Sequence, residues 1–177
     1  MNRLVILLNF FIVSTVYSIT VEDFIIQDSN FPNRYRQKIF LGQPWKDDRI
    51  QDVLVKIENL DQWSGYKDVI IYYYENIEII TARIIPSASY REVVDISIIG
   101  KKFSTTREMI IGNTKNEMIS IYGKPQVNII SSGYTYFGYK LNNPYSDWGG
   151  DTQQYSLLFT LENDIITKIT VHYIHNT

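Results

Sequence analysis

The sequence contains no cysteine, and only two of its 177 residues are histidine. The absence of cysteine excludes disulfide bonds, thiolate metal sites, a cysteine nucleophile and a lipidated cysteine anchor. His172 and His175 lie three residues apart near the end of the chain, and on a strand their side chains would point to opposite faces. We therefore expect no metal site and two solvated imidazoles in a frayed terminus, unless that terminus is helical.

The chain also lacks an excess of basic residues, because 19 acidic side chains outnumber 17 basic ones and the formal net charge is −2. Nucleic-acid-binding domains need a basic face, so we expect no nucleic-acid partner. No nucleophile-elbow, P-loop or dinucleotide-binding pattern occurs, so no cofactor is expected. An enzyme is therefore the least favoured class of function.

Two pairs of aspartates could still indicate a catalytic site or a metal site. Asp47 and Asp48 resemble a catalytic carboxylate pair, but their place before a helical pattern explains them as caps. Asp147 and Asp151 lie in a glycine-containing loop, but that loop lacks the alternating ligands and final glutamate of a calcium loop. We expect a solvated turn there and not a calcium site.

The first 18 residues have the pattern of a secretory signal peptide. Arg3 precedes an apolar run over residues 4–16, and Val16 and Ser18 occupy the −3 and −1 positions of a cleavage site. The run is short for a transmembrane helix, although an uncleaved anchor and a buried strand are the alternatives. We therefore expect a secreted or periplasmic protein that begins near Ile19 and keeps no membrane span after cleavage.

The clearest local pattern lies in residues 112–125. Thr114 and Glu117 have the spacing of a capping box, in which each side chain bonds to the backbone N–H of the other residue. Gly123 supplies the left-handed residue that ends a helix, and Pro125 prevents its continuation. The apolar residues between them fall on one side of that helix: Met118, Ile119 and Tyr122.

Two parts of the chain share one order of expected elements. The first has a strand at 21–26, a helix with apolar residues at i, i+3, i+4 and i+7 (Ile50, Val53, Leu54 and Ile57), and strands at 66–75, 77–85 and 93–99. The second has the helix after Thr114 and strands at 133–140, 155–162 and 165–173, the last two joined by a hairpin at Asn163-Asp164. Residues 108–112 match residues 38–42, because each segment has a charged residue, three apolar residues and a glycine in that order.

Matching residues support a duplication. Asp23, Ile26 and Phe31 recur as Asp95, Ile98 and Phe103, and Ser64-Gly65-Tyr66 recurs as Ser132-Gly133-Tyr134. Chance alignment of two similar segments is the alternative. The predicted fold class is α+β, with two tandem repeats that each pack a short helical segment on an antiparallel β-sheet. The predicted organisation is a signal peptide (1–18), a first repeat (19–95) and a second repeat (96–177), in one continuous structure without a flexible linker.

The pattern in the second repeat runs from Gly112, Thr114, Glu117 and Met118 to Tyr122, Gly123 and Pro125, followed by Tyr134 and Tyr136, by Leu157, Leu158 and Phe159, and by Ile166, Ile169 and Val171. It resembles the small modules of the SmpA/OmlA type, the outer-membrane assembly lipoproteins, and their structural relatives, the β-lactamase inhibitory proteins. The resemblance implies a tandem module that binds or inhibits another protein. The chain has neither the lipidated cysteine of the first group nor the disulfides of the second, so neither group's partner transfers to it.

Aromatic residues supply the candidate surface. Tyr72 and Tyr74 share one face of their strand, and Tyr134 and Tyr136 repeat that spacing. Residues 141–154 are an insertion absent from the first repeat, and they carry Tyr145 and Trp148. Tyrosine and tryptophan among short polar residues suit protein recognition, so we expect these six residues to contact another protein. The alternative is that the rings pack in the core and that the loop folds back onto it.

The predicted function is therefore an exported, non-catalytic protein-binding or inhibitory module, at the bacterial cell envelope. The second function that the sequence supports is a carbohydrate- or cell-wall-binding module. In that case Trp63, Trp148 and nearby tyrosines would stack on the faces of sugar rings.

Overall fold

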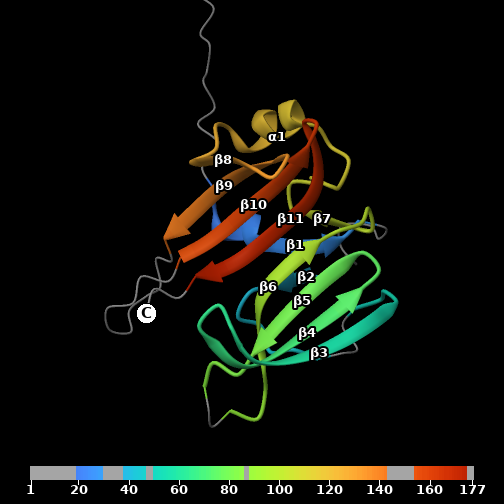
Figure 1. Ribbon diagram of the computed structural model, residues 1–177, viewed down its shortest axis with the longest axis vertical. Coiled ribbons are helices and arrows are strands. Elements are labelled where there is room, and N and C mark those ends of the chain that lie inside the picture. The colour runs from blue at the N-terminus through green and yellow to red at the C-terminus, as the bar shows by residue number, and fades with distance from the viewer. Residues whose placement is uncertain (1–18, 30–37, 47–49, 86–87, 143–153, 175–177) are drawn as a thin grey trace, which may run out of the picture.

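The computed structural model describes residues 19–29, 38–46, 50–85, 88–142 and 154–174, and within them eleven antiparallel strands form two sheets (Figure 1). The smaller sheet has the order β2-β1-β7. It consists of β1 (Ile25–Asp28), β2 (Lys38–Phe40) and β7 (Phe103–Thr105). A short 3-10 helix, η1 (Val21–Phe24), leads into β1, and the single α-helix of the described residues is α1 (Lys115–Tyr122).

The larger sheet has eight strands in the order β3-β4-β5-β6-β11-β10-β9-β8. Its first four strands are β3 (Leu54–Trp63), β4 (Tyr66–Tyr74), β5 (Ile77–Ala82) and β6 (Glu92–Ile98). Its last four are β8 (Val127–Ser131), β9 (Tyr134–Asn142), β10 (Gln154–Glu162) and β11 (Ile165–Ile174). Each group is a meander of sequential neighbours, and the two meanders join where β6 pairs with β11.

Tight turns explain the connections within each meander. Ser64-Gly65 joins β3 to β4, and Ser132-Gly133 joins β8 to β9, with positive φ at both residues of each turn. Asn163-Asp164 joins β10 to β11 in the same conformation, as the sequence predicts. Two residues with positive φ form the hairpin turn whose twist matches that of the flanking strands.

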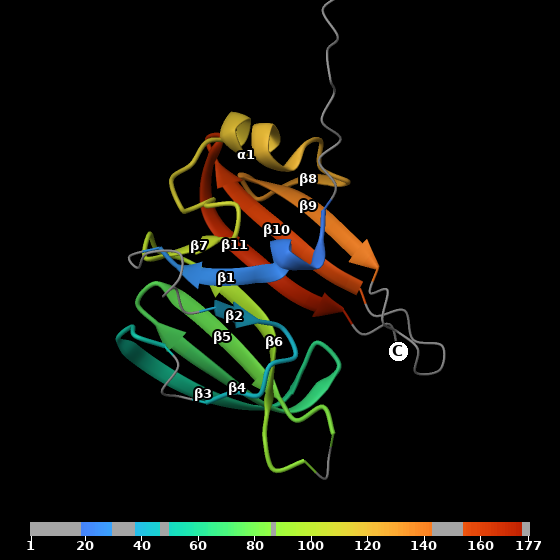
Figure 2. The same cartoon turned by 180° about the vertical axis from the view of Figure 1, so that it is seen from behind.

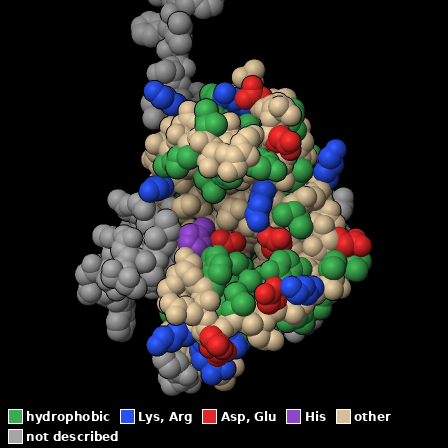
Figure 3. Space-filling view, in the orientation of Figure 1, with side chains coloured by type: hydrophobic (Ala, Val, Ile, Leu, Met, Phe, Trp, Pro, Cys, Tyr) green, Lys and Arg blue, Asp and Glu red, His purple; other side chains and the backbone are tan. Residues whose placement is uncertain are grey.

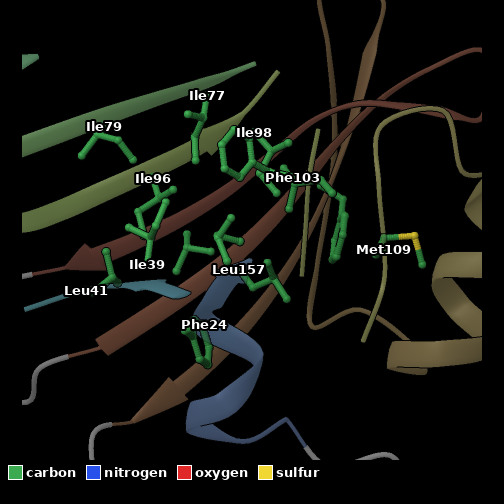
Figure 4. Packing of buried hydrophobic residues seen from close by; sticks show 14 of the residues in the cluster. Phe24, Ile39, Leu41, Ile77, Ile79, Ile96, Ile98, Phe103, Met109 and Leu157 are labelled. Carbon is green, nitrogen blue, oxygen red and sulfur yellow. The ribbon is translucent and has the colours of Figure 1, made fainter. Parts of the chain in front are cut away.

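One face of the larger sheet is covered by the smaller sheet and by α1, which lie on the same side of it (Figures 1 and 2). The core between these layers draws residues from each of them, and Figure 4 shows its central part. Phe24 and Ile39 come from the region of the smaller sheet, Met118 comes from α1, and Ile96 and Leu157 come from the larger sheet. Because side chains alternate along a strand, the residues between these core positions point to the opposite face.

Helix α1 forms as predicted. The Thr114 hydroxyl accepts a hydrogen bond from the Glu117 N–H at 3.2 Å, and the Glu117 carboxylate accepts one from the Thr114 N–H at 2.6 Å. Gly123 ends the helix as predicted, but with φ 76° and ψ −163°, which is not the predicted left-handed helical conformation and is essentially restricted to glycine. Pro125 follows two residues later, and Gly112 precedes the helix with φ 97°.

The predicted fold class, α+β with two tandem helix-on-sheet repeats, is wrong. The described chain is mainly β, its two meanders form one eight-stranded sheet, and its first half has no helix beyond the short η1. The apolar residues spaced like a helical stripe do not face the core: only Ile50 is buried, whereas Val53, Leu54 and Ile57 are exposed. Leu54 and Ile57 belong to β3, which pairs with β4 along most of its length. Pairing with β4, together with the β-branched residues, therefore overrides the helical spacing of the apolar residues.

Other local predictions also need correction. Residues 21–24 form η1 and not a strand, and the sequence did not predict the strands β2, β7 and β8. Asp23 lies in η1 whereas Asp95 lies in the central strand β6, so their positions in the fold are not equivalent. Asp47 and Asp48 lie outside the described residues, as do residues 1–18. None of the helices in the described part of the chain is long and apolar enough to cross a membrane.

Candidate binding face

The candidate site is the face of the larger sheet that points away from the smaller sheet and α1, which we call the outer face. Figure 3 views this face, and charged side chains of both signs and histidine gather across its middle, with hydrophobic side chains on either side. Two hollows on this face are lined by aromatic and polar side chains.

The middle of the outer face is built by the joint between the two meanders. Here Asp95 lies opposite His172, and Ser97 lies opposite Thr170. The residues that alternate with them along β6 and β11 point into the core, where they are fully buried: Ile96, Ile98, Ile169 and Val171. The alternation of apolar and polar residues along both strands therefore places this polar row outward.

These four polar side chains form one hydrogen-bonded network. Nδ1 of His172 lies 3.0 Å from Oδ2 of Asp95, and the Ser97 hydroxyl donates to Oδ1 of the same carboxyl at 3.3 Å. The hydroxyls of Ser97 and Thr170 lie 2.9 Å apart. Burial raises the pKa of Asp95 above its ordinary value, and the contacts with His172 and Lys168 offset only part of this effect. Asp95 therefore holds its proton to a higher pH than a solvated aspartate does.

The first hollow has a volume of about 310 Å³ and lies beside this network, on the side of β4 and β5. Trp63 and Tyr73 supply aromatic walls, and the ring of Trp63 meets His172 edge-on at 5.4 Å between centroids. Lys168 donates to the Glu78 carboxylate at 2.9 Å. The hollow therefore combines aromatic surface with carboxyl, ammonium and hydroxyl groups.

The second hollow, of about 320 Å³, lies on the side of β9 and β10. Its walls include Tyr134 and Tyr136, whose ring centroids are 6.5 Å apart, together with Thr160 and Thr167. Lys168 lines both hollows. One belt of accessible side chains therefore crosses the sheet from Trp63 to Tyr134, and Lys168 lies where its two halves meet.

The structure brings together only part of the predicted surface. Tyr134 and Tyr136 lie side by side on the outer face, whereas Tyr72 and Tyr74 are buried, with 7% and 4% of their surface exposed. Tyr73, between them, reaches the outer face. Strand β4 has apolar or aromatic residues on both faces, so its sequence does not show which tyrosines point outward. Tyr145 and Trp148 lie outside the described residues.

Several residues of the belt were not predicted to be functional. His172 was expected in a frayed terminus, but it lies in β11, half-buried against Asp95. The polar alternation of Lys168, Thr170 and His172 was visible in the sequence and indicates their common face. The partner Asp95 was not recognisable, because it comes from a strand 77 residues away.

The contacts in the network place a carboxyl group between the hydroxyl and the imidazole. The Ser97 hydroxyl contacts Asp95 and Thr170, and Nδ1 of His172 contacts Asp95. Among the residues that the structure describes, no group of three or more histidine, aspartate or glutamate side chains could hold a metal ion.

Comparison of the chain with protein-family models, with curated proteins and with solved structures gives no match. The resemblance of residues 108–173 to the SmpA/OmlA modules and the inhibitory proteins stays a prediction from the sequence.

Proposed function

We propose that the protein is an exported, non-catalytic module that binds or inhibits another protein through its outer face. The observation that carries the proposal is the belt of two hollows that share Lys168, with aromatic side chains at both ends and hydrogen-bonding groups between them. Export rests on the predicted signal peptide. A partner at the bacterial cell envelope accords with export and with the resemblance of the second half.

The shape of the belt favours a protein partner. Both hollows are open to solvent, and they adjoin at Lys168 on the larger sheet. Protein interfaces are enriched in tyrosine and tryptophan, and a few such anchors supply most of the binding energy. Tyr134 and Tyr136 at one end and Trp63 and Tyr73 at the other could each receive or cover a protruding side chain of the partner.

The contacts within the belt favour binding over catalysis. Asp95, Ser97, Thr170 and His172 bond to one another, which fixes their orientation before a partner arrives. A preformed polar surface loses little conformational entropy on association.

The experiment is capture of envelope proteins on the immobilised protein, followed by titration of the captured protein against variants. Tyr136→Ala should weaken binding by about 2 kcal/mol or more, which is roughly 30-fold, if the ring is a central anchor. Tyr90→Ala removes an exposed tyrosine that lines neither hollow, and it should leave the affinity unchanged. Equal affinity of the Tyr136→Ala variant and the unaltered protein would refute the outer face as the binding site.

The carbohydrate alternative is favoured by the first hollow alone. Trp63 and Tyr73 lie there with Glu78 and Asp95, and aromatic rings beside carboxyl groups also suit a sugar. A glycan array separates the two proposals. Glycan binding that Trp63→Ala abolishes and Tyr136→Ala leaves intact would favour the carbohydrate function.

A further inference from the structure

Strand β3 is an edge strand of the larger sheet. It runs for ten residues, and among the described residues its ladder partner is β4 alone. Figure 1 shows β3 at one end of the sheet, opposite the end formed by β8. An edge strand presents unpaired backbone N–H and C=O groups, which can pair with a strand of another chain.

The start of this edge is unusually apolar for a surface. Val53, Leu54, Val55 and Ile57 expose between 46% and 66% of their surface, although they fall within five consecutive residues. A bulge at Val55 interrupts the ladder, and from Lys56 to Trp63 the register with β4 is constant, although the ladder has no pair at Asp61, opposite which Asp68 has φ 52°. The bulge disrupts the ladder locally, so pairing with a new strand can be regular only from Lys56 onward.

The charges on the regular part are self-complementary. Lys56 and Glu58 flank Ile57, and both point to the outer face because they lie opposite Tyr73 and Ile71. Within one chain their side chains form an ion pair at 2.7 Å, and Glu58 also accepts from the Tyr73 hydroxyl at 3.2 Å.

A two-fold axis through Ile57, perpendicular to the sheet, would place Lys56 of each copy opposite Glu58 of the other in an antiparallel pair. A shift of the axis to Lys56 or to Glu58 places like charges opposite each other, which is unfavourable. Among the registers that such an axis allows along β3, the one centred on Ile57 places opposite charges opposite each other, and it pairs Lys56, Ile57 and Glu58 of both copies.

We propose that two copies of the protein associate through β3, with Ile57 on the two-fold axis, so that the larger sheet continues from one copy into the other. The Ile57 side chains then meet on the covered face of the sheet, and a network of four charges spans the joint on the outer face. Because the axis is perpendicular to the sheet, both outer faces lie on the same side of the dimer. This inference does not depend on the proposed function.

The other edge is a weaker candidate for the same contact. Strand β8 has five residues and no charged side chain, so nothing in it selects a register for a second copy. Its exposed residues Ile129 and Ile130 nevertheless provide a direct comparison.

Sedimentation velocity of the purified protein, from micromolar concentrations to about 1 mM, tests the proposal. The unaltered protein should shift from one copy to two as the concentration rises. Lys56→Glu and Glu58→Lys should each raise the dissociation constant at least about tenfold, because each substitution places like charges opposite each other twice. An equimolar mixture of the two variants should form a mixed dimer, because an acidic edge then meets a basic one.

The mixture separates a lost interface from a misfolded variant, because misfolded chains would not recover association. Lys124→Glu makes the same change in charge at an exposed site outside β3, and it should leave the dissociation constant unchanged. A protein that stays monomeric up to about 1 mM overturns the proposal. So does a dimer that both charge variants retain, and so does a dimer that is lost on Ile130→Lys but kept by Lys56→Glu, because that result would locate the contact at β8.

Discussion

Asp95 is a buried carboxyl group of the outer face, at the joint of the two meanders. Burial raises its pKa above the ordinary value of 3.8, so ionisation of the folded protein costs free energy that ionisation of the unfolded chain does not. The protonated carboxyl therefore stabilises the folded state relative to the ionised one. This contribution to the free energy of unfolding is complete below pH 3.8 and is lost as the pH rises through the raised pKa.

Asp95→Asn should therefore raise the urea midpoint at pH 7 and leave it nearly unchanged at pH 3, because the amide cannot ionise. Glu162→Gln, at an exposed position of β10, should change neither midpoint. A lower midpoint for Asp95→Asn at pH 7 would mean that the ionised carboxyl gains more from His172 and Lys168 than it loses by burial.

At the scale of the element, α1 is specified almost entirely by its own residues. Thr114→Ala removes the oxygen that accepts from the Glu117 N–H, and it should lower the free energy of unfolding by about 1 kcal/mol. Gly123→Val should cost more, because a β-branched residue tolerates φ 76° poorly. Denaturant midpoints measure both effects, with Asn116→Ala at an exposed helical position as the control. A neutral Gly123→Val would show that this residue does not need a glycine-only conformation.

The difference between α1 and β3 explains which elements could be predicted. The helix carries its start and end signals within ten residues, from Thr114 to Gly123, so reading the local sequence is sufficient. The apolar spacing from Ile50 to Ile57 matches a helix equally well, but β3 is fixed by its pairing with β4. Strands β9, β10 and β11 were predictable because their apolar and polar residues alternate.

The candidate site was predictable only in part for the same reason. Tyr134 and Tyr136 lie on a strand with one buried face, whereas Tyr72 and Tyr74 lie on a strand that buries residues on both. The contact between Asp95 and His172 depends on the pairing of β6 with β11, which no local pattern contains.

At the scale of the whole molecule, the two meanders share one core. Across the joint, Ile98 lies opposite Ile169 and Ile96 lies opposite Val171, and all four belong to the same buried cluster as Phe24 and Met118. A shared core of this kind should make the two halves unfold in one cooperative transition.

A substitution in one half can test this through a probe in the other. The three tryptophans are Trp45, Trp63 and Trp148, and the ring of Trp63 contacts His172 of β11. In a background with Trp63→Phe and Trp148→Phe, the remaining tryptophan is Trp45, whose ring packs against Tyr72, so its fluorescence reports on the first half. Ile169→Val removes one buried methyl group from β11 and should lower the free energy of unfolding by about 1 kcal/mol. Because the core is continuous across the joint, the urea midpoint should fall equally by fluorescence and by far-UV circular dichroism. Ile130→Val, at an exposed position of β8, should leave both midpoints in place. A fluorescence midpoint that Ile169→Val leaves unchanged would mean that the first meander unfolds independently of the second, despite the shared sheet.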